Sequence, residues 1–416
     1  MKIAVLCPHF APDVAPTGEV ITRIVVELAA LGHELHVVTA LPWYRNHAVE
    51  PGWDGQLVRH ETVSWGRITR LHPFPTDKGN LPARAVAFGV FTLAVAVEAT
   101  LNRFHPEVIL AMSPPLTLGL AGVVAARRNG IPLVFNIQDV FPDVAVELGR
   151  LTQPQVIGLA SWLERTSYRA ADTVTVLSDD LARNVRAKVG EATPVEVIPN
   201  FVDTDWIRPD VEVDAASSYR SELGLGDRRV VMYAGNVGFS QSLDLVLDAA
   251  RLWRERDEVV FVINGSGVAV ESLRQEIDRD GLENVVLARL QPRWRLPEVL
   301  ATAELHLVPL RAGLAKASVP SKLYSILAAG RPILAAVDPG TEVQRTVELA
   351  RAGVCVPPDD LAAFVSALDL LLADPGKAAA MGRAGRSWVE AWAAPSAVAG
   401  AYDRLFRSLV TSDRHP

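Results

Sequence analysis

The chain contains few of the residues that build disulfide frameworks or structural metal sites. Only two of its 416 residues are cysteine, Cys7 and Cys355, and each lies in an apolar run far from the other. We find no CxxC pair and no cysteine–histidine set typical of structural zinc, and the nine histidines suggest no metal site either. The sequence therefore predicts no metal and no cofactor, and a reduced cytoplasmic setting is the simplest interpretation.

The chain also lacks a net positive charge and an apolar run long enough to span a membrane. The formal net charge of −7 argues against a nucleic-acid-binding protein, which would be basic overall. The candidate membrane segment at residues 85–97 is bounded by Arg84 and Glu98 and is too short to span a bilayer. Residues 2–7 form a short apolar run that Pro8 ends, which is typical of a first strand rather than a signal peptide.

What the chain does contain is a regular alternation of strand-like and helical patterns. Strand-like runs lie at residues 3–6, 35–39, 108–111, 133–136, 173–177 and 195–198, and then at 230–234, 259–263, 285–288, 305–309, 333–336 and 354–356. Amphipathic patterns such as 20–31, 243–253 and 268–278 separate them. This alternation predicts an α/β fold with two doubly wound, Rossmann-like domains.

The boundary between the two series lies in a segment rich in proline and aspartate, residues 198–209. We therefore expect an N-terminal domain at 1–198, a C-terminal domain at 199–392, and a hinge between them. A last helical pattern follows at 393–412. Ligands of such folds bind outside the carboxyl ends of the strands, so a cleft between the domains is the expected site.

The most specific motif is S-V-P-S-K-L-Y-S-I-L-A-A-G-R-P at residues 318–332. Pro320 and Ser321 precede Lys322, which enters a short apolar helix that ends at Gly330. Free N–H groups and the dipole of a helix N-terminus, together with a lysine, suit a diphosphate. The alternative is a solvated surface lysine beside a buried helix.

This motif resembles the donor-binding motif of retaining glycosyltransferases of the GT-B fold, family GT4. A second stretch, A-G-N-V-G-F-S-Q at 234–241, is similar to the form in the colanic-acid-type and WbuB-type branch. The resemblance implies two Rossmann-like domains facing across a cleft. It also implies a final helix, 393–412, that packs back on the first domain; the alternative is one more helix of the second domain.

The resemblance implies that the second domain and one N-terminal loop bind a nucleotide-sugar donor. The candidate donor-binding residues are Gly18, Gly235, Asn236, Gln241, Gly265, Ser266, Gly267, Leu290, Pro320, Ser321, Lys322 and Ser325. Two departures stand out. Asn236 and Gln241 replace an arginine and a lysine common in the family, and Ala317 and Ser325 replace two glutamates.

The acceptor is expected on the first domain, where the resemblance implies contacts from His9 and Gln138. Asp139 ends a predicted strand and is the best candidate to orient or deprotonate the acceptor hydroxyl. Gly18 matches one glycine of a family pair; the alternative is a plain turn in which Thr17 caps the following helix.

Three other acidic features are expected to have no role in catalysis or metal binding. Asp143 and Glu147 are expected to be acids at a helix N-terminus. The D-x-D sequence at Asp203–Asp205 matches a manganese motif of a different transferase fold, but it lies in the hinge, and matches this short arise by chance.

Together these motifs imply a metal-independent transfer of sugar from a UDP- or GDP-sugar to a hydroxyl, with retention. We expect a lipid-linked saccharide acceptor, carried on polyprenyl diphosphate, in cell-surface polysaccharide biosynthesis. The alternatives are a non-catalytic nucleotide-sugar-binding subunit and a nucleotide-sugar 2-epimerase on the same fold.

Three sequence features predict peripheral membrane association at the inner face: an aromatic loop, a basic stretch and the apolar run that follows it. Trp43, Tyr44 and Trp53 lie in an irregular loop, and residues 59–84 carry an excess of basic residues before the apolar run. The alternative is that residues 85–97 form an ordinary core helix.

Overall fold

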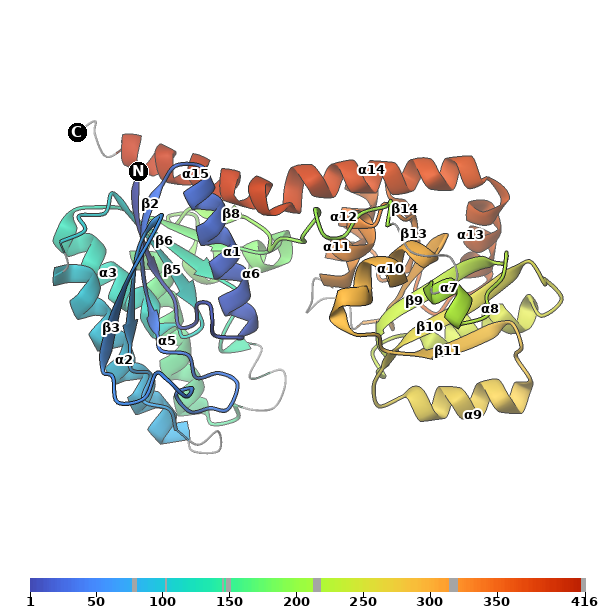
Figure 1. The fold of residues 1–416 in the computed structure, drawn as a ribbon, viewed down its shortest axis with the longest axis horizontal. Coiled ribbons are helices and arrows are strands. Elements are labelled where there is room, and N and C mark those ends of the chain that lie inside the picture. The colour runs from blue at the N-terminus through green and yellow to red at the C-terminus, as the bar shows by residue number, and fades with distance from the viewer. Residues whose placement is uncertain are drawn as a thin grey trace. The chain divides into compact units, whose positions relative to one another are not determined.

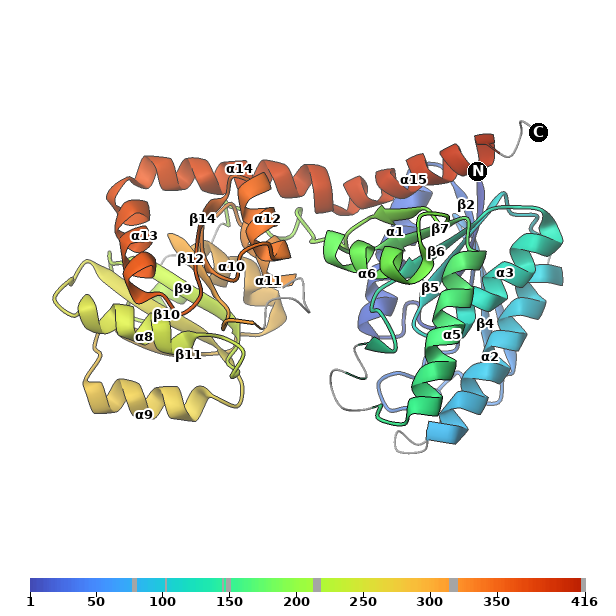
Figure 2. The same ribbon diagram turned by 180° about the vertical axis from the view of Figure 1, so that it is seen from behind.

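The computed structural model describes residues 1–76, 81–101, 103–143, 146, 151–211, 218–313 and 321–412. The chain divides into two compact units. Unit 1 comprises Met1–Asn200 and Pro395–Pro416, and unit 2 comprises Phe201–Ala394. Each unit is built on its own sheet with helices on both faces (Figures 1 and 2).

Unit 1 contains an eight-stranded sheet in the order β3-β4-β2-β1-β5-β6-β7-β8. Its strands are β1 (Lys2–Leu6), β2 (Glu34–Ala40), β3 (Val58–Val63), β4 (Gly66–Leu71), β5 (Val108–Ser113), β6 (Leu133–Ile137), β7 (Thr173–Val176) and β8 (Val195–Val197). All neighbouring pairs are parallel except β3 and β4, which pair antiparallel. The sequence reasoning missed this pair, because β3 lies at the sheet edge and alternates exposed with half-buried residues.

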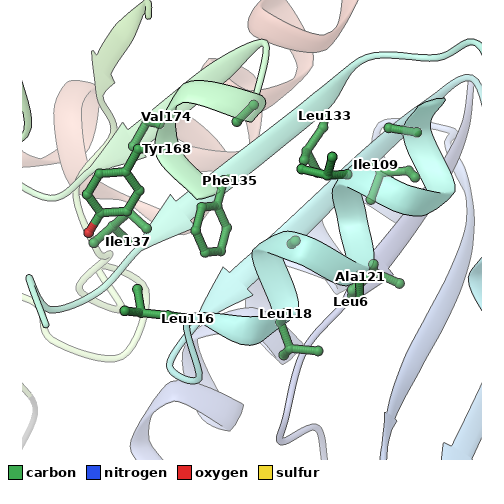
Figure 3. Packing of buried hydrophobic residues seen from close by; sticks show 14 of the residues in the cluster. Leu6, Ile109, Leu116, Leu118, Ala121, Leu133, Phe135, Ile137, Tyr168 and Val174 are labelled. Carbon is green, nitrogen blue, oxygen red and sulfur yellow. The ribbon is translucent and has the colours of Figure 1, made fainter. Parts of the chain in front are cut away.

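The helices of unit 1 are α1 (Pro16–Ala30), α2 (Leu81–Leu101), α3 (Thr117–Asn129), α5 (Pro154–Ala170), α6 (Asp179–Val189) and α15 (Pro395–Ser412). Apolar residues of α2, α3, α5 and α6 form one core cluster with the sheet. Figure 3 shows part of this cluster, with Phe135 of β6 lying between α3 and Tyr168 of α5. Helix α3 approaches the sheet closely because Gly119 faces the Phe135 ring, and a Cβ there would lie 2.7 Å from it.

On the opposite face of this sheet, α1 packs against α15 (Figures 1 and 2). Nε2 of His33, after α1, lies 2.9 Å from the carboxylate of Asp403 on α15. The last helix thus belongs to unit 1. The predicted start of this helix at 393 was wrong, because Ala394 is extended and the helix begins at Pro395. A residue before proline is disfavoured in the helical region.

Unit 2 contains a six-stranded sheet in the order β11-β10-β9-β12-β13-β14, with every neighbouring pair parallel. Its strands are β9 (Arg229–Asn236), β10 (Val259–Ser266), β11 (Val285–Arg289), β12 (Leu305–Pro309), β13 (Ile333–Ala336) and β14 (Gly353–Val356). These strands confirm the predicted second series.

The helices described in unit 2 are α7 (Tyr219–Glu222), α8 (Leu243–Leu252), α9 (Val270–Asp280), α10 (Leu296–Thr302), α11 (Ser321–Ala328), α12 (Glu342–Leu349), α13 (Leu361–Ala373) and α14 (Pro375–Ala393), with a 3₁₀ turn at Arg293–Arg295. Gly330 follows α11 with a φ of +65°, a left-handed conformation that suits glycine. The short helix predicted before Gly330 and the strand predicted at 333–336 are both present.

The segment after Asn200 is anchored to unit 2. The Arg386 guanidinium of α14 donates hydrogen bonds to the carbonyls of Thr204, Ile207 and Ala328, at 2.8, 2.6 and 2.5 Å. Three charge-assisted bonds to carbonyl oxygens hold this stretch against α14 and α11.

Candidate functional site

In unit 2, the ends of β9 and β10 approach so closely that only glycine fits between them. Gly235 and Gly265 are partners in the parallel register, and a Cβ on Gly265 would lie 2.0 Å from the Gly235 carbonyl oxygen. A Cβ on Gly267 would lie 2.2 Å from the Val237 carbonyl oxygen. Backbone packing therefore explains Gly265 and Gly267, whereas a φ of +149° favours glycine at Gly235. Ser266 is exposed at the carboxyl end of the sheet.

The loop after β9 is closed by its own side chains. Gln241 Oε1 accepts a hydrogen bond from the Gly238 N–H at 3.1 Å, and the Tyr233 hydroxyl donates to the Asn236 carbonyl at 2.5 Å. A Cβ on Gly238 would lie 2.8 Å from Asn236 Nδ2 and 3.2 Å from Gln241 Oε1. The structure thus brings Asn236 and Gln241, the two amides that replace family cations, to the same glycine.

Lys322, the second residue of α11, reaches this loop. Its ammonium nitrogen lies 4.3 Å from the centre of the Tyr233 ring, and its Cδ would lie 3.6 Å from a Cβ on Gly235. Burial lowers the Lys322 pKa to about 8, because a desolvated ammonium loses hydration. A lysine, a helix N-terminus and a glycine-lined strand end therefore meet in unit 2, an arrangement suited to a diphosphate.

The remaining predicted donor residues lie around this position or outside the described residues. Leu290 follows β11 and is 58% exposed. Ser325 is half-buried on α11, one turn beyond Lys322. Pro320 lies outside the described residues, and only the backbone of Ser321 is described, as the start of α11.

In unit 1, Gln138 follows β6 and is buried. Its Nε2 donates to Asn136 Oδ1 at 2.6 Å, and its Oε1 accepts from Asn200 Nδ2 at 2.8 Å. Asn136 in turn donates to the Tyr402 hydroxyl of α15 at 2.9 Å. Gln138 thus links the end of β6 to Asn200 directly and to helix α15 through Asn136. Both ends of its amide have partners within unit 1, which leaves fewer hydrogen bonds for the predicted acceptor contact.

Asp139, beside Gln138, is exposed at the carboxyl end of β6. Within the described part of the chain, no hydrogen bond or ion pair joins its carboxylate to another residue. Asp143 behaves differently, because it accepts from Asn184 Nδ2 and lies 2.9 Å from Lys188 Nζ. Asp143 is therefore part of a structural ion-pair network, and Glu147 lies outside the described residues.

The loop after β1 holds His9 in a cluster that sequence reasoning found only in part. His9 Nδ1 lies 2.7 Å from the carboxylate of Asp13, whose side chain is fully buried. The His9 ring stacks on Trp43 at 5.6 Å and meets the Tyr44 ring edge-on at 5.3 Å. Asp13 was missed, although its four-residue spacing from His9 within a turn-rich loop was a usable signal.

Gly18 packs on this cluster. A Cβ on Gly18 would lie 3.0 Å from the His9 Cβ, so the residue lets α1 pass close to His9. The alternative in which Thr17 caps α1 is wrong, because the helix begins at Pro16 and its N-cap, Ala15, offers no side-chain bond.

The arginines that suggested a basic membrane surface are engaged within unit 1. Arg70 is buried against Glu61 at 2.9 Å, and Arg59 lies over the Trp53 ring at 4.2 Å. Arg67 lies over the Phe104 ring at 5.0 Å. These three arginines therefore make contacts within unit 1, and Arg59 covers Trp53, one of the loop aromatics.

The described residues offer neither a metal site nor a membrane-spanning helix. They contain no group of three or more His, Cys, Asp or Glu side chains placed to hold a metal ion. Asp203 accepts from the backbone N–H of Asp205 and of Trp206, at 3.2 and 3.0 Å, and so closes a turn. In that same part of the chain, no helix is both long and apolar enough to cross a bilayer.

Two known family models match successive parts of the chain. Residues 17–200 match the model described as Glycosyl transferase 4-like domain, and residues 217–388 match Glycosyl transferases group 1. The chain is a group 1 glycosyltransferase of family GT4. The predicted family and enzyme class are thereby confirmed. The match favours the glycosyltransferase interpretation over the two alternatives, a non-catalytic subunit and an epimerase.

Among its relatives, the glycosyltransferase is 29% identical to a protein of Escherichia coli K12 named as a colanic acid biosynthesis glycosyl transferase, WcaI. That match covers 88% of this chain and 91% of WcaI. It is 34% identical to the GDP-mannose-dependent alpha-(1-6)-phosphatidylinositol monomannoside mannosyltransferase of Mycolicibacterium smegmatis, over 52% of this chain and 57% of that one. The first match supports the predicted colanic-acid-type branch.

Solved structures of the same fold include HepE of Anabaena in complex with UDP, with a TM-score of 0.65 and 16% identity over 98% of this chain and 100% of HepE. The lipopolysaccharide glycosyltransferase WaaG aligns with a TM-score of 0.59 and 14% identity over 96% of this chain and 99% of WaaG. These likenesses confirm the predicted GT-B fold with its two Rossmann-like domains.

Proposed function

We propose that this glycosyltransferase takes a sugar from a nucleotide diphosphate donor bound by unit 2 and transfers it, with retention, to a hydroxyl of an acceptor bound by unit 1. The position of Lys322 carries the proposal. Its ammonium group lies at the start of α11 beside Gly235, where it would face the diphosphate of a bound donor. The names of a GDP-mannose-dependent relative and of HepE complexes with UDP and UDP-glucose support a UDP- or GDP-linked donor.

In this proposal no metal takes part, and the chain's own groups stabilise the leaving diphosphate. Lys322 and the N–H groups of α11 supply positive potential, while Asn236, Gln241 and Ser266 offer hydrogen-bonding groups at the same strand ends. Asp139 orients the acceptor hydroxyl from unit 1. Positioning and electrostatic stabilisation together would lower the barrier without a protein nucleophile.

We further propose that the acceptor is a lipid-linked saccharide in cell-surface polysaccharide biosynthesis and that the enzyme works at a membrane surface. The names of WcaI and of the phosphatidylinositol mannoside transferase support an acceptor of this class. Helix α2 supports the membrane part. It buries one apolar face through Phe91, Val95 and Ala99 and exposes a second one. The exposed face consists of Val86, Val90, Leu93, Val97 and Leu101.

Calorimetry with UDP and GDP tests the donor site. A charge-assisted hydrogen bond is worth about 1.5–3 kcal/mol, so Lys322→Ala is expected to weaken binding of the preferred nucleotide roughly ten- to a hundredfold. Lys377→Ala, an exposed lysine on α14, is the matched control and is expected to leave affinity unchanged. Equal affinity in the wild type and Lys322→Ala would remove Lys322 from the donor site.

A further inference from the structure

The loop after β1 presents a histidine whose ring is held in one orientation by a buried carboxylate. Asp13 Oδ2 lies 2.7 Å from His9 Nδ1, and Asp13 Oδ1 accepts the backbone N–H of Tyr44 at 3.1 Å. The Asp13 side chain is fully buried and that of His9 is 12% exposed. Both carboxylate oxygens therefore have a partner within unit 1, as a buried ionised carboxylate requires.

This arrangement determines which ring nitrogen of a neutral His9 carries the proton. An ionised carboxylate only accepts hydrogen bonds, so Nδ1 must donate to Asp13. Nε2 then keeps its lone pair. Among the described residues no group forms a hydrogen bond with His9 Nε2, so this lone pair is available to a bound molecule.

The surrounding contacts keep the ring in place. Trp43 covers one ring face at an interplanar angle of 27°, and the Tyr44 ring meets it edge-on. The chain between His9 and Asp13 is itself anchored, because the Ala11 N–H donates to Thr22 Oγ1 at 2.9 Å and the Ala11 carbonyl accepts from Arg70 at 2.6 Å. A side chain held this firmly needs little reorganisation to accept a proton in one direction.

We propose that His9 takes the proton of the acceptor hydroxyl during transfer and that Asp13 positions it. The inference rests on the proposed binding of the acceptor to unit 1. The acceptor oxygen approaches the anomeric carbon on the face that the diphosphate leaves, as retention without a protein nucleophile requires. As the new bond to the anomeric carbon forms, the O–H bond breaks and the proton moves to Nε2. The bond from the anomeric carbon to the diphosphate breaks, and the diphosphate leaves with the electron pair. The resulting imidazolium donates from Nδ1 to Asp13, which stabilises it.

The acceptor would be a hydroxyl of a saccharide, the acceptor class proposed above. Asp139, exposed and without a described partner, then acts as an orienting group and His9 as the base. The two assignments differ in their consequences, because only a base can be replaced by an added proton acceptor from solution.

Kinetics with added imidazole provide the first test. Wild type, His9→Ala and Asp13→Asn are assayed for nucleoside diphosphate release from UDP-glucose and from GDP-mannose, with octyl β-D-glucoside and octyl α-D-mannoside as acceptor probes. His9→Ala is expected to lower kcat roughly a hundredfold or more, and imidazole to restore part of it. KM for the donor is expected to stay the same. His33→Ala removes the other histidine–aspartate pair of unit 1 and is the matched control, expected to show no gain from imidazole.

Histidine NMR gives a readout that does not depend on turnover. In the full chain labelled with ¹⁵N-histidine, His9 is assigned by its loss in His9→Gln, and its tautomer is read from long-range ¹H–¹⁵N couplings. The Nδ1–H tautomer is expected in the wild type. In Asp13→Asn the amide oxygen keeps the Tyr44 N–H and the amide nitrogen faces the ring, so the Nε2–H tautomer is expected.

Wild-type kcat in His9→Ala, or an Nε2–H tautomer of His9 in the wild type, would overturn the inference. If the wild type releases no nucleotide from any probe pair, the proposed donor and acceptor classes are challenged instead, and the NMR result still decides whether His9 is poised as a base.

Discussion

The ammonium nitrogen of Lys322 lies 4.3 Å from the centre of the Tyr233 ring, and this contact joins the start of α11 to the carboxyl end of β9. Tyr233 also donates to the carbonyl of Asn236, so one aromatic side chain supports both the lysine and the loop that follows β9. A cation over a ring face is attracted by the ring's electrons, which partly offsets the loss of hydration. The ammonium group of Lys322 is thus held in a position where the oxygens of a bound diphosphate would compensate for its lost hydration.

The first prediction concerns the pH dependence of nucleotide binding. Burial lowers the Lys322 pKa to about 8, so the free enzyme loses this positive charge as the pH rises through 8. Affinity for UDP or GDP is therefore expected to be full below that pH and to fall above it, as measured by calorimetry at pH 7, 8 and 9.5. Lys322→Arg keeps its charge at all these values, so its affinity is expected to stay flat. A wild-type affinity that does not change between pH 7 and 9.5 would contradict the assignment.

The second prediction separates acceptor groups from donor groups. Asp139 lies in unit 1, and the proposed donor residues around Lys322 lie in unit 2. Asp139→Asn is expected to lower sugar transfer roughly a hundredfold, the usual scale for groups that orient or exchange a proton. UDP and GDP affinity, measured on the same variant, is expected to match the wild type. Full transfer activity would rule Asp139 out of the reaction.

The third prediction concerns acid stability. His306 in unit 2 is buried, and its Nε2 donates to the Leu300 carbonyl at 2.9 Å. Burial lowers the His306 pKa from 6.5 to about 4, and burial likewise lowers that of His36 in unit 1 to about 3. Because the unfolded chain takes up protons first, stability is full above pH 6.5 and is lost as the pH falls. Each histidine is expected to lower the free energy of unfolding by roughly 1.4 kcal/mol for every pH unit below 6.5, down to its folded pKa.

Urea unfolding at pH 7, 6 and 5 measures this loss. His306→Gln removes one titrating group while it keeps a side-chain donor for the Leu300 carbonyl, so the pH dependence of unit 2 is expected to become less steep. His105→Gln, an exposed histidine of unit 1, is the control. If the stability of His306→Gln depends on pH as steeply as that of the wild type, the buried imidazole of His306 is not the cause of the acid sensitivity of unit 2.

The fourth prediction tests the exposed face of α2. Val86, Leu93 and Leu101 are 67%, 66% and 73% exposed on one side of a helix whose other side is buried. Wild-type protein is expected to float with liposomes that carry lipid-linked saccharide or anionic lipid, because exposed apolar side chains partition into the interface. Leu93→Gln is expected to weaken flotation. Leu252→Gln, an equally exposed leucine of unit 2, is expected to leave it unchanged. Equal flotation of wild type and Leu93→Gln would exclude this face of α2.

Local patterns of apolar residues were enough to predict much of the fold. Every strand predicted from an apolar run is present, because a strand buried on both faces shows as a short continuous run of apolar residues. The missed pair β3 and β4 has no such run on its outer strand, and its arginines are paired by contacts that the sequence does not show. Examples are the ion pair of Arg70 with Glu61 and the position of Arg59 over the Trp53 ring.

The sequence by itself determined the two Rossmann-like domains and the family, and it supplied the motif at Lys322 that we propose binds a diphosphate. These depend on apolar periodicity, on turn residues and on short motifs, all of which are local along the chain. Only the tertiary structure decided that Gln138 bonds to Asn200 and that Asn136 next to it bonds to Tyr402, more than 200 positions away in sequence. It also decided that a buried Asp13 holds His9. The physical reason is that the partner of a buried polar group is selected by packing, since desolvation penalises any donor or acceptor left unpaired.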